Sequence, residues 1–211
     1  MPAKTQRTIP ADESRAPAVR DPEGTKAAIL AAATREFAEH GFGGARVDAI
    51  ADRAHINKRM LYHYWGDKEA LYLAVLEKTY ADIRSAEVAL DLTHRAPEAA
   101  LRELVLFTWH YFLEHPEFLS LLGTENLLKA KFLSTSQTIK AVNSPIIAAL
   151  EDVIGRGQKA RLFRDRLDPL DTYLTIASLC FFYLSNRWTL TRVFGRDLMK
   201  PAEIERWGNH I

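Results

Sequence analysis

A cluster of basic and aromatic side chains stands out in the segment HINKRMLYHYWGDKEAL, residues 55–71. Lys58 and Arg59 are followed one helical turn later by Tyr62 and His63, so the four side chains share one side of a short helix. Lysine and arginine neutralise phosphates, and arginine also reaches the O6 and N7 atoms of guanine. Tyrosine and histidine donate hydrogen bonds to phosphate. The pattern predicts a nucleic-acid-binding surface on a helix too short to be stable alone.

The flanking sequence supplies the helices that such a segment needs. Apolar residues recur every four positions before it, and Gly41 ends that pattern because glycine adopts the left-handed backbone that follows a helix. Thr25 is a suitable N-cap, with Asp21 as an alternative, and Asp67 is placed to cap a long helix after the cluster. We expect helices over 25–39, 47–54, 58–64 and 67–86. The middle pair has helix-turn-helix spacing, which places a helix in the major groove of DNA.

Helical patterns also dominate the second half of the chain, and no convincing strand is present. Pro145 is expected to bend or split one of these helices. The predicted helices cover 97–114, 117–133, 136–156, 168–193 and 201–211. The fold class is therefore all-α. We predict a flexible arm over 1–22, a helix-turn-helix DNA-binding domain over 23–70, and a helical ligand-binding and dimerisation domain over 71–211, with 71–86 as the connector.

Charge and cysteine content limit the classes of function. The chain of 211 residues has a formal net charge of +1, so any nucleic-acid contact must rest on a local patch. Such a patch exists from Arg53 to Lys68, where four basic residues and only Asp67 give +3. Cys180 is the single cysteine, which excludes an internal disulfide and suits a cytoplasmic protein. No apolar stretch is long enough for a membrane span.

Residues 25–76 resemble the DNA-binding domain of the TetR family of bacterial transcription regulators. The features that carry the resemblance are FAEHGF, VDAIADRA, KRMLYHYW and DKEAL in that order. Carried over residue by residue, the resemblance implies DNA contacts from Arg46, Lys58, Arg59, Tyr62, His63 and Lys68. It also implies a homodimer that binds a palindromic operator in double-stranded DNA, with the last two predicted helices forming the dimer interface.

Five residues depart from the family pattern. Ala45 and Arg46 stand where the family has a hydroxyl residue that caps the second helix, and Arg46 could replace its phosphate contact by charge. His55 stands where glycine is usual, which predicts either a positive φ at a non-glycine residue or a different turn. Asn57 replaces a frequent serine and is an equally good cap, and Arg59 replaces a frequent glycine, which alters the sequence preference.

The second domain is rich in large apolar residues, as expected for a helical bundle that opens a ligand pocket. Polar residues among them are the candidates for binding a small-molecule effector: Trp109, His110, Asn126, Lys129, Asn186 and Arg187. The resemblance implies that the effector releases a repressor from DNA by favouring a conformer with the wrong spacing between recognition helices.

Other functions stay open at this stage. The chain could be a transcriptional activator, a regulator without a ligand, an all-helical enzyme or a structural helical module. GFGGAR at 41–46 follows a helix and not a strand, so its glycines do not indicate a phosphate-binding loop. No histidine pair has i,i+4 spacing and no catalytic constellation is apparent, so we expect no metal, no cofactor and no enzyme activity.

Overall fold

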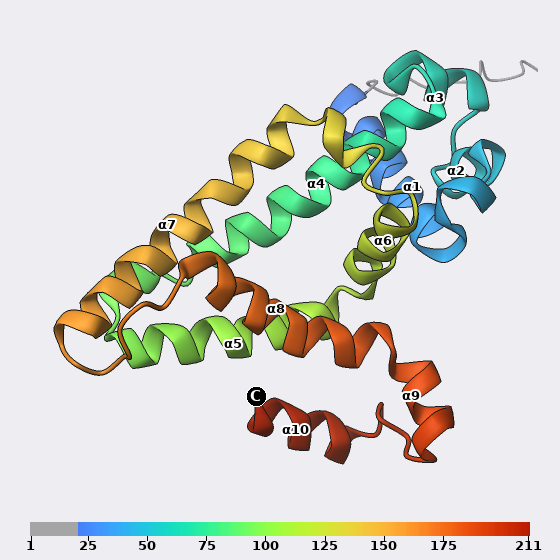
Figure 1. Ribbon diagram of the computed structural model, residues 1–211. Helices are drawn as coiled ribbons and strands as arrows, with labels where there is room; N and C mark the ends of the chain where they lie inside the picture. The colour runs from blue at the N-terminus through green and yellow to red at the C-terminus, as the bar shows by residue number, and fades with distance from the viewer. Residues whose placement is uncertain (1–20) are drawn as a thin grey trace, which may run out of the picture.

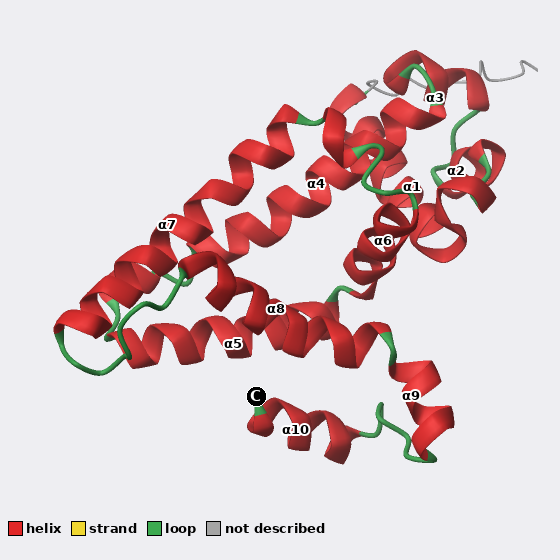
Figure 2. Ribbon diagram, viewed as in Figure 1, coloured by secondary structure: helices red, strands yellow, loops and turns green. Residues whose placement is uncertain are grey.

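A computed structural model of the chain describes residues 21–211, apart from the side chains of residues 142–144. The predicted arm over 1–22 lies almost wholly outside this range. Figure 1 shows three helices gathered at one end around the start of α4, which runs from there into the rest of the molecule. Within the described range all regular structure is helical (Figure 2), so the all-α prediction is confirmed.

The first helix, α1 (Pro22–Gly44), begins one turn earlier than its main predicted start. The side chain of Asp21, the alternative cap, accepts a hydrogen bond from the Gly24 N–H at 2.9 Å. The helical path is interrupted at Gly41, which has φ 64° and ψ 176°, a region open essentially to glycine alone. The glycine stop was therefore predicted correctly, and a further helical turn follows it before α2.

The helix-turn-helix consists of α2 (Val47–Arg53) and α3 (Lys58–Trp65), and α4 (Lys68–Val88) follows directly. His55 adopts φ 55°, so the turn keeps the positive φ that glycine usually supplies. Asn57 accepts a hydrogen bond from the Met60 N–H at 2.8 Å, and Asp67 accepts one from the Ala70 N–H at 2.7 Å. Both predicted caps are confirmed.

The remaining helices form the larger part of the molecule. They are η1 (Leu92–His94), α5 (Pro97–Glu114), α6 (Pro116–Leu127), η2 (Leu133–Thr135), α7 (Gln137–Lys159), α8 (Pro169–Ser185), α9 (Arg187–Phe194) and α10 (Pro201–His210). The predicted helix over 117–133 ends early, because Lys129 and Ala130 both take positive φ. The predicted helix over 168–193 is divided at Asn186. Conversely, α7 continues through Pro145 without a break.

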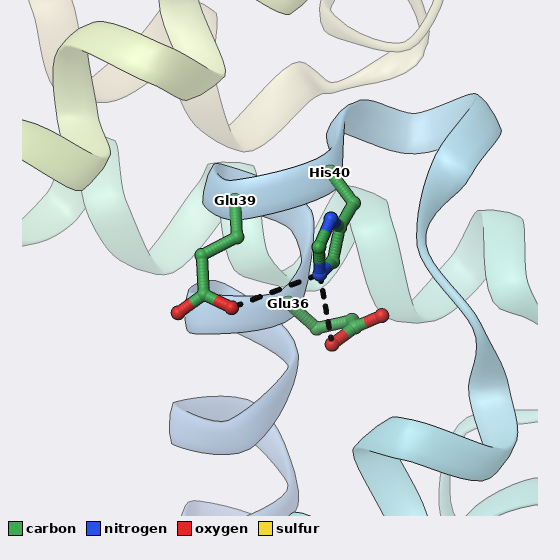
Figure 3. A group of neighbouring side chains, drawn as sticks. All are labelled: Glu36, Glu39 and His40. Atoms are coloured by element: carbon green, nitrogen blue, oxygen red, sulfur yellow. Dashed lines mark ion pairs between the residues drawn. The ribbon is translucent and has the colours of Figure 1, made fainter.

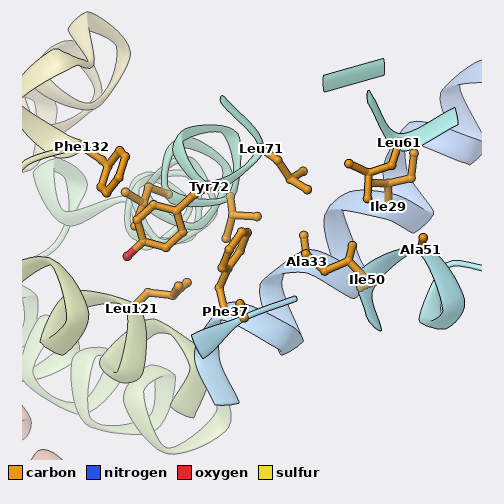
Figure 4. Close-up of a cluster of buried hydrophobic side chains, with 14 of the residues drawn as sticks. Ile29, Ala33, Phe37, Ile50, Ala51, Leu61, Leu71, Tyr72, Leu121 and Phe132 are labelled. Carbon is orange, nitrogen blue, oxygen red and sulfur yellow. The ribbon is translucent and has the colours of Figure 1, made fainter. Parts of the chain in front are cut away.

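One apolar core joins the DNA-binding helices to the second half of the chain. Figure 4 shows side chains of α1 to α4 packed together with Leu121 of α6 and with Phe132. The Phe132 ring lies 4.6 Å from the Phe42 ring and 5.0 Å from the Tyr72 ring, measured between centroids. The core beneath the helix-turn-helix is thus completed by residues far along the sequence, and α6 packs directly on α1.

Two further apolar clusters hold the larger part together. One lies among α5, α7 and α8, and the other is closed by α10. The Trp207 ring of α10 stacks on Tyr183 at 4.9 Å, and Gly208 approaches the Trp109 ring so closely that a Cβ atom there would lie 2.8 Å from Nε1. The apolar side of α10 therefore faces the interior of its own chain.

None of the helices between residues 21 and 211 combines the length and the apolar character that crossing a membrane requires.

Candidate functional site

The outer side of α3 presents the residues that the sequence singled out. Lys58, Arg59, Tyr62 and His63 are exposed, whereas Leu61 is fully buried and holds the helix against the core. Tyr64 and Trp65 are half-buried and pack against the same core. A helix with this division can enter a groove along its polar side while its apolar side stays packed.

The basic charge of this surface is smaller than the sequence count indicated. The Lys58 Nζ atom lies 2.9 Å from Asp48 Oδ1 on α2, and this hydrogen bond raises the pKa of Lys58. Lys68 is half-buried with its Nζ atom 4.8 Å from the centre of the Phe42 ring, and burial lowers its pKa. Arg46 and Arg59 are exposed and form no ion pair with the described part of the chain. These two guanidinium groups are therefore the least neutralised charges of the surface.

A cluster of charged residues braces the helix-turn-helix from α1. His40 Nε2 lies 3.8 Å from a Glu39 oxygen and 4.0 Å from a Glu36 oxygen (Figure 3). Arg53 of α2 completes the cluster, because its Nη2 atom lies 3.0 Å from Glu39 and 3.6 Å from Glu36. Although two carboxylates and an imidazole could hold a metal ion, the guanidinium already neutralises both carboxylates. We interpret the cluster as a brace between α1 and α2.

Glu36 also compensates for the missing hydroxyl cap of α2. Arg46 occupies the cap position and makes no side-chain capping bond. Its backbone N–H instead donates to Glu36 Oε1 at 3.0 Å, and the Glu36 side chain is buried. A carboxylate near a helix start is favourable because the helix dipole is positive there. The Arg46 side chain is consequently free to reach outward.

The six effector-binding candidates do not converge on one cavity. Trp109 is buried in the core and Arg187 donates to the Leu184 carbonyl at 2.6 Å. Asn186 donates to the Phe182 carbonyl at 2.9 Å. His110, Asn126 and Lys129 are exposed. None of the six lines any of the four cavities described for the structure.

Sequence reasoning missed a buried ion pair beside a cavity of about 220 Å³. Arg84 Nη1 lies 2.6 Å from Glu87 Oε2, and the two side chains are only 7% and 2% exposed. Arg84 Nη2 also donates to the Tyr173 hydroxyl at 2.6 Å, which connects α4 to α8. The i,i+3 spacing of Arg84 and Glu87 was the available signal, but this spacing is equally common on solvated helix faces.

A helix-turn-helix at one end, a long connecting helix and a cavity-bearing helical domain together define the class of DNA-binding transcription regulators. The family model for the tetR family of bacterial regulatory proteins matches residues 29–75, and that for the tetracyclin repressor-like C-terminal domain matches residues 97–211.

Relatives of known class agree with these matches. The chain is 43% identical over 183 residues to the HTH-type transcriptional repressor NicS of Pseudomonas putida, covering 87% of this chain and 86% of that protein. Among solved structures, the putative transcriptional regulator SCO4942 from Streptomyces coelicolor superposes with a TM-score of 0.64 at 26% identity, over 88% of this chain and 95% of that one. A structure of AibR in complex with isovaleryl coenzyme A and operator DNA shares the fold, with a TM-score of 0.63, 20% identity and coverage of 88% and 95%.

The chain therefore belongs to the TetR family of bacterial transcription regulators. The family resemblance found in residues 25–76 is confirmed, and it extends through the C-terminal domain. The family consists of regulators of transcription, and NicS is itself a transcriptional repressor.

Proposed function

We propose that this chain is a homodimeric repressor that binds a palindromic operator and is released from it by a small-molecule effector. The exposed cationic and aromatic face of α3, held by a helix-turn-helix on a shared core, carries the proposal. Its similarity to NicS, a repressor, supports the direction of regulation. AibR, which shares the fold, was crystallised with both an acyl-coenzyme A and operator DNA, which supports the combination of effector and operator.

The proposed DNA contacts divide by chemistry. Arg59 and Tyr62 face the bases, with Arg59 reading guanine and the Tyr62 ring contacting a thymine methyl group. Arg46, Lys58, His63 and Lys68 bind phosphates and set the position of α3 in the groove. Lys58 has three N–H donors, of which Asp48 uses one, so it can bind a phosphate while it keeps this ion pair.

The proposed dimer surface lies on α8 and α9, which together occupy the first of the two predicted interface helices, 168–193. Apolar side chains on these two helices are exposed to solvent: Leu170, Leu174, Phe182, Trp188, Val193 and Phe194. Leu170, Leu174 and Phe182 are spaced by multiples of four and form one stripe along α8. Exposed apolar residues in such a stripe fit burial against a second copy of the same chain. The apolar side of α10 is already covered internally.

Binding to the DNA upstream of the protein's own coding region tests the proposal. Fluorescence anisotropy would compare this duplex with a scrambled one across a salt series. We expect tight binding that prefers the upstream DNA and weakens steeply with salt, because phosphate contacts release counterions. Equal weak binding to both duplexes would place the operator elsewhere, and absence of binding even at low salt would overturn the DNA-binding proposal.

A further inference from the structure

We propose that the cavity beside Arg84 and Glu87 binds small molecules that combine a compact apolar body with a protonated nitrogen, and that Glu87 receives the nitrogen. The inference deepens the proposed function, because it names the chemical class of effector on which that function depends.

The cavity has a polar floor and largely apolar walls. Arg84, Glu87, Leu92 and Ile146 are buried and form its inner end. The walls are completed by Val88, Pro145 and Ala149, with Asp91 and Thr93 near the exposed rim. Val88 is 67% exposed although it is apolar. A volume of about 220 Å³ suits a molecule with a single ring or a short branched chain.

Both members of the ion pair on the floor keep one buried polar atom without a hydrogen-bond partner, Oε1 on Glu87 and Nε on Arg84. Arg84 is the only cation paired with the Glu87 carboxylate in the described structure. The guanidinium already faces Glu87, the Tyr173 hydroxyl and the Tyr173 ring at 5.3 Å. A buried carboxylate oxygen without a donor costs free energy, and a ligand N–H that reaches Oε1 removes this cost.

The charges around the cavity favour a cation over an anion. Two carboxylates, Glu87 and Asp91, line it against the single guanidinium of Arg84. Asp91 is paired with His94 at 2.6 Å near the surface, so Glu87 dominates the buried end. A ligand carboxylate would meet Glu87 at close range, whereas a ligand ammonium would complete a row of alternating charges with Glu87 and Arg84.

Binding of a cation at Glu87 should release a proton, which the packing of an apolar ligand alone would not do. Burial raises the pKa of Glu87 to about 7, and Arg84 only partly opposes this effect. The other titratable groups facing Glu87 are Tyr173 on α8 and Tyr111 on α5, while α7 contributes only apolar residues to the cavity lining. A bound cation favours ionised Glu87, so binding must release a proton near neutral pH and must strengthen as pH rises.

Three probes with the same ring separate the ligand classes: benzylamine as the cation, benzyl alcohol as the neutral molecule and benzoate as the anion. Binding to the full-length protein without DNA would be measured by calorimetry in two buffers of different ionisation enthalpy. At about pH 8 we expect benzylammonium to bind at least about tenfold more tightly than either of the others, with proton release. At about pH 5.5 its affinity should fall at least about tenfold, because Glu87 is then protonated.

Variants assign the effect to the cavity. Glu87→Gln should remove most of the benzylammonium affinity and its pH dependence, and Ala149→Phe should block binding while leaving the ion pair in place. Glu114→Gln, an exposed carboxylate on α5, is the matched control and should bind as the unaltered protein does. If Glu87→Gln does not fold, Ala149→Phe and the pH series still test the site.

Three results would overturn the inference. Benzoate could bind as tightly as benzylammonium, the benzylammonium affinity could be the same in both cavity variants as in the unaltered protein, or the cation could show no saturable binding. Operator binding by the protein without any probe tests the proposed function separately. Its failure would leave the cavity result standing, and a failed cavity test would leave operator binding standing.

Discussion

Among the departures from the family pattern, Arg59 is the one expected to change base recognition. It is exposed on α3 and pairs with no carboxylate in residues 21–211, so its full donor set is available to a base edge. Arg59→Ala should lower the preference for operator over scrambled duplex by tenfold to a hundredfold, which corresponds to about 1–3 kcal/mol for one bidentate contact. Competition binding with both duplexes would measure the ratio. An unchanged preference would mean that Arg59 does not read a base.

Lys68 provides the contrasting case of a proposed phosphate contact. Its ammonium group lies over the Phe42 ring at the first turn of α4, which fixes its position before DNA arrives. Lys68→Ala should weaken binding to all duplexes alike and reduce the salt slope by about one. Lys159→Ala removes an exposed lysine near the far end of α7 and should leave both quantities unaltered. If the two variants behave alike, Lys68 lies outside the DNA-binding face.

Glu87 makes stability depend on pH. Its pKa in the folded protein is about 7, above the usual 4.5, so the folded state binds more protons between these values. The contribution is fully present below about pH 4.5 and is lost as pH rises to about 7, a change on the order of 3 kcal/mol. The unfolding free energy of the wild type relative to Glu87→Gln should therefore fall across this range in urea titrations. A constant difference would show that Glu87 is ionised throughout.

At the scale of elements, the segment between α6 and α7 couples the two parts of the chain. Glu125 is buried and accepts hydrogen bonds from the N–H groups of Phe132 and Leu133, at 3.2 and 3.0 Å. These bonds place the Phe132 ring against Phe42 and Tyr72. A shift of α6 therefore moves a ring that belongs to the core of the DNA-binding helices.

Phe132→Ala should destabilise the protein by about 3–5 kcal/mol, because it empties a buried ring position in a shared core. In the fraction that stays folded, the effector should change operator affinity less than in the wild type. Thermal unfolding and operator binding with and without ligand would measure both effects. Leu127→Ala removes an apolar side chain that is 87% exposed and is the matched control. Equal coupling in the two variants would exclude Phe132 from the path.

Local signals explain why the first four helices could be predicted within a few residues. Asn57 and Asp67 cap α3 and α4 through hydrogen bonds to residues three positions away. Gly41 interrupts α1 because its backbone adopts a conformation that glycine favours. The division between α8 and α9 at Asn186 contains no proline or glycine, so the local sequence did not predict it. Pro145 did not split α7; it and Ala141 are exposed, so water can satisfy the carbonyl that the missing N–H leaves free.

The site was predictable only in part for the same reason. The outward residues of α3 follow from helical spacing, but the pairing of Lys58 with Asp48 depends on the angle between two helices. Arg84 and Glu87 have the spacing of an ordinary surface pair, and only the packing of α5, α7 and α8 around them makes them buried. Tertiary packing, and not the spacing of the two residues, distinguishes this buried pair from a pair on a solvated helix face.

At the scale of the whole molecule, the proposed dimer sets the distance between its two recognition helices by the way in which the two chains join. Figure 1 shows α8 and α9 far from α3, so the proposed dimer surface on these helices would act on DNA geometry at a distance. Phe182→Glu should place a charge in that surface, shift the protein towards monomer and weaken operator binding by at least about tenfold. Sedimentation velocity would report the oligomeric state. Ser85→Glu, which places the same charge at an exposed polar position of α4 outside this stripe, is the control and should leave the oligomeric state unchanged.

The four tryptophans give the molecule its own optical probes, and two of them lie on elements that the proposals concern. Trp65 ends the recognition helix, Trp109 and Trp207 lie in the cluster closed by α10, and Trp188 is 67% exposed on α9. Emission from an indole in water lies at longer wavelength than emission from a buried one. If the other three were substituted, Trp188 fluorescence would report association without any label. Its emission should shift to longer wavelength when dilution separates the two chains.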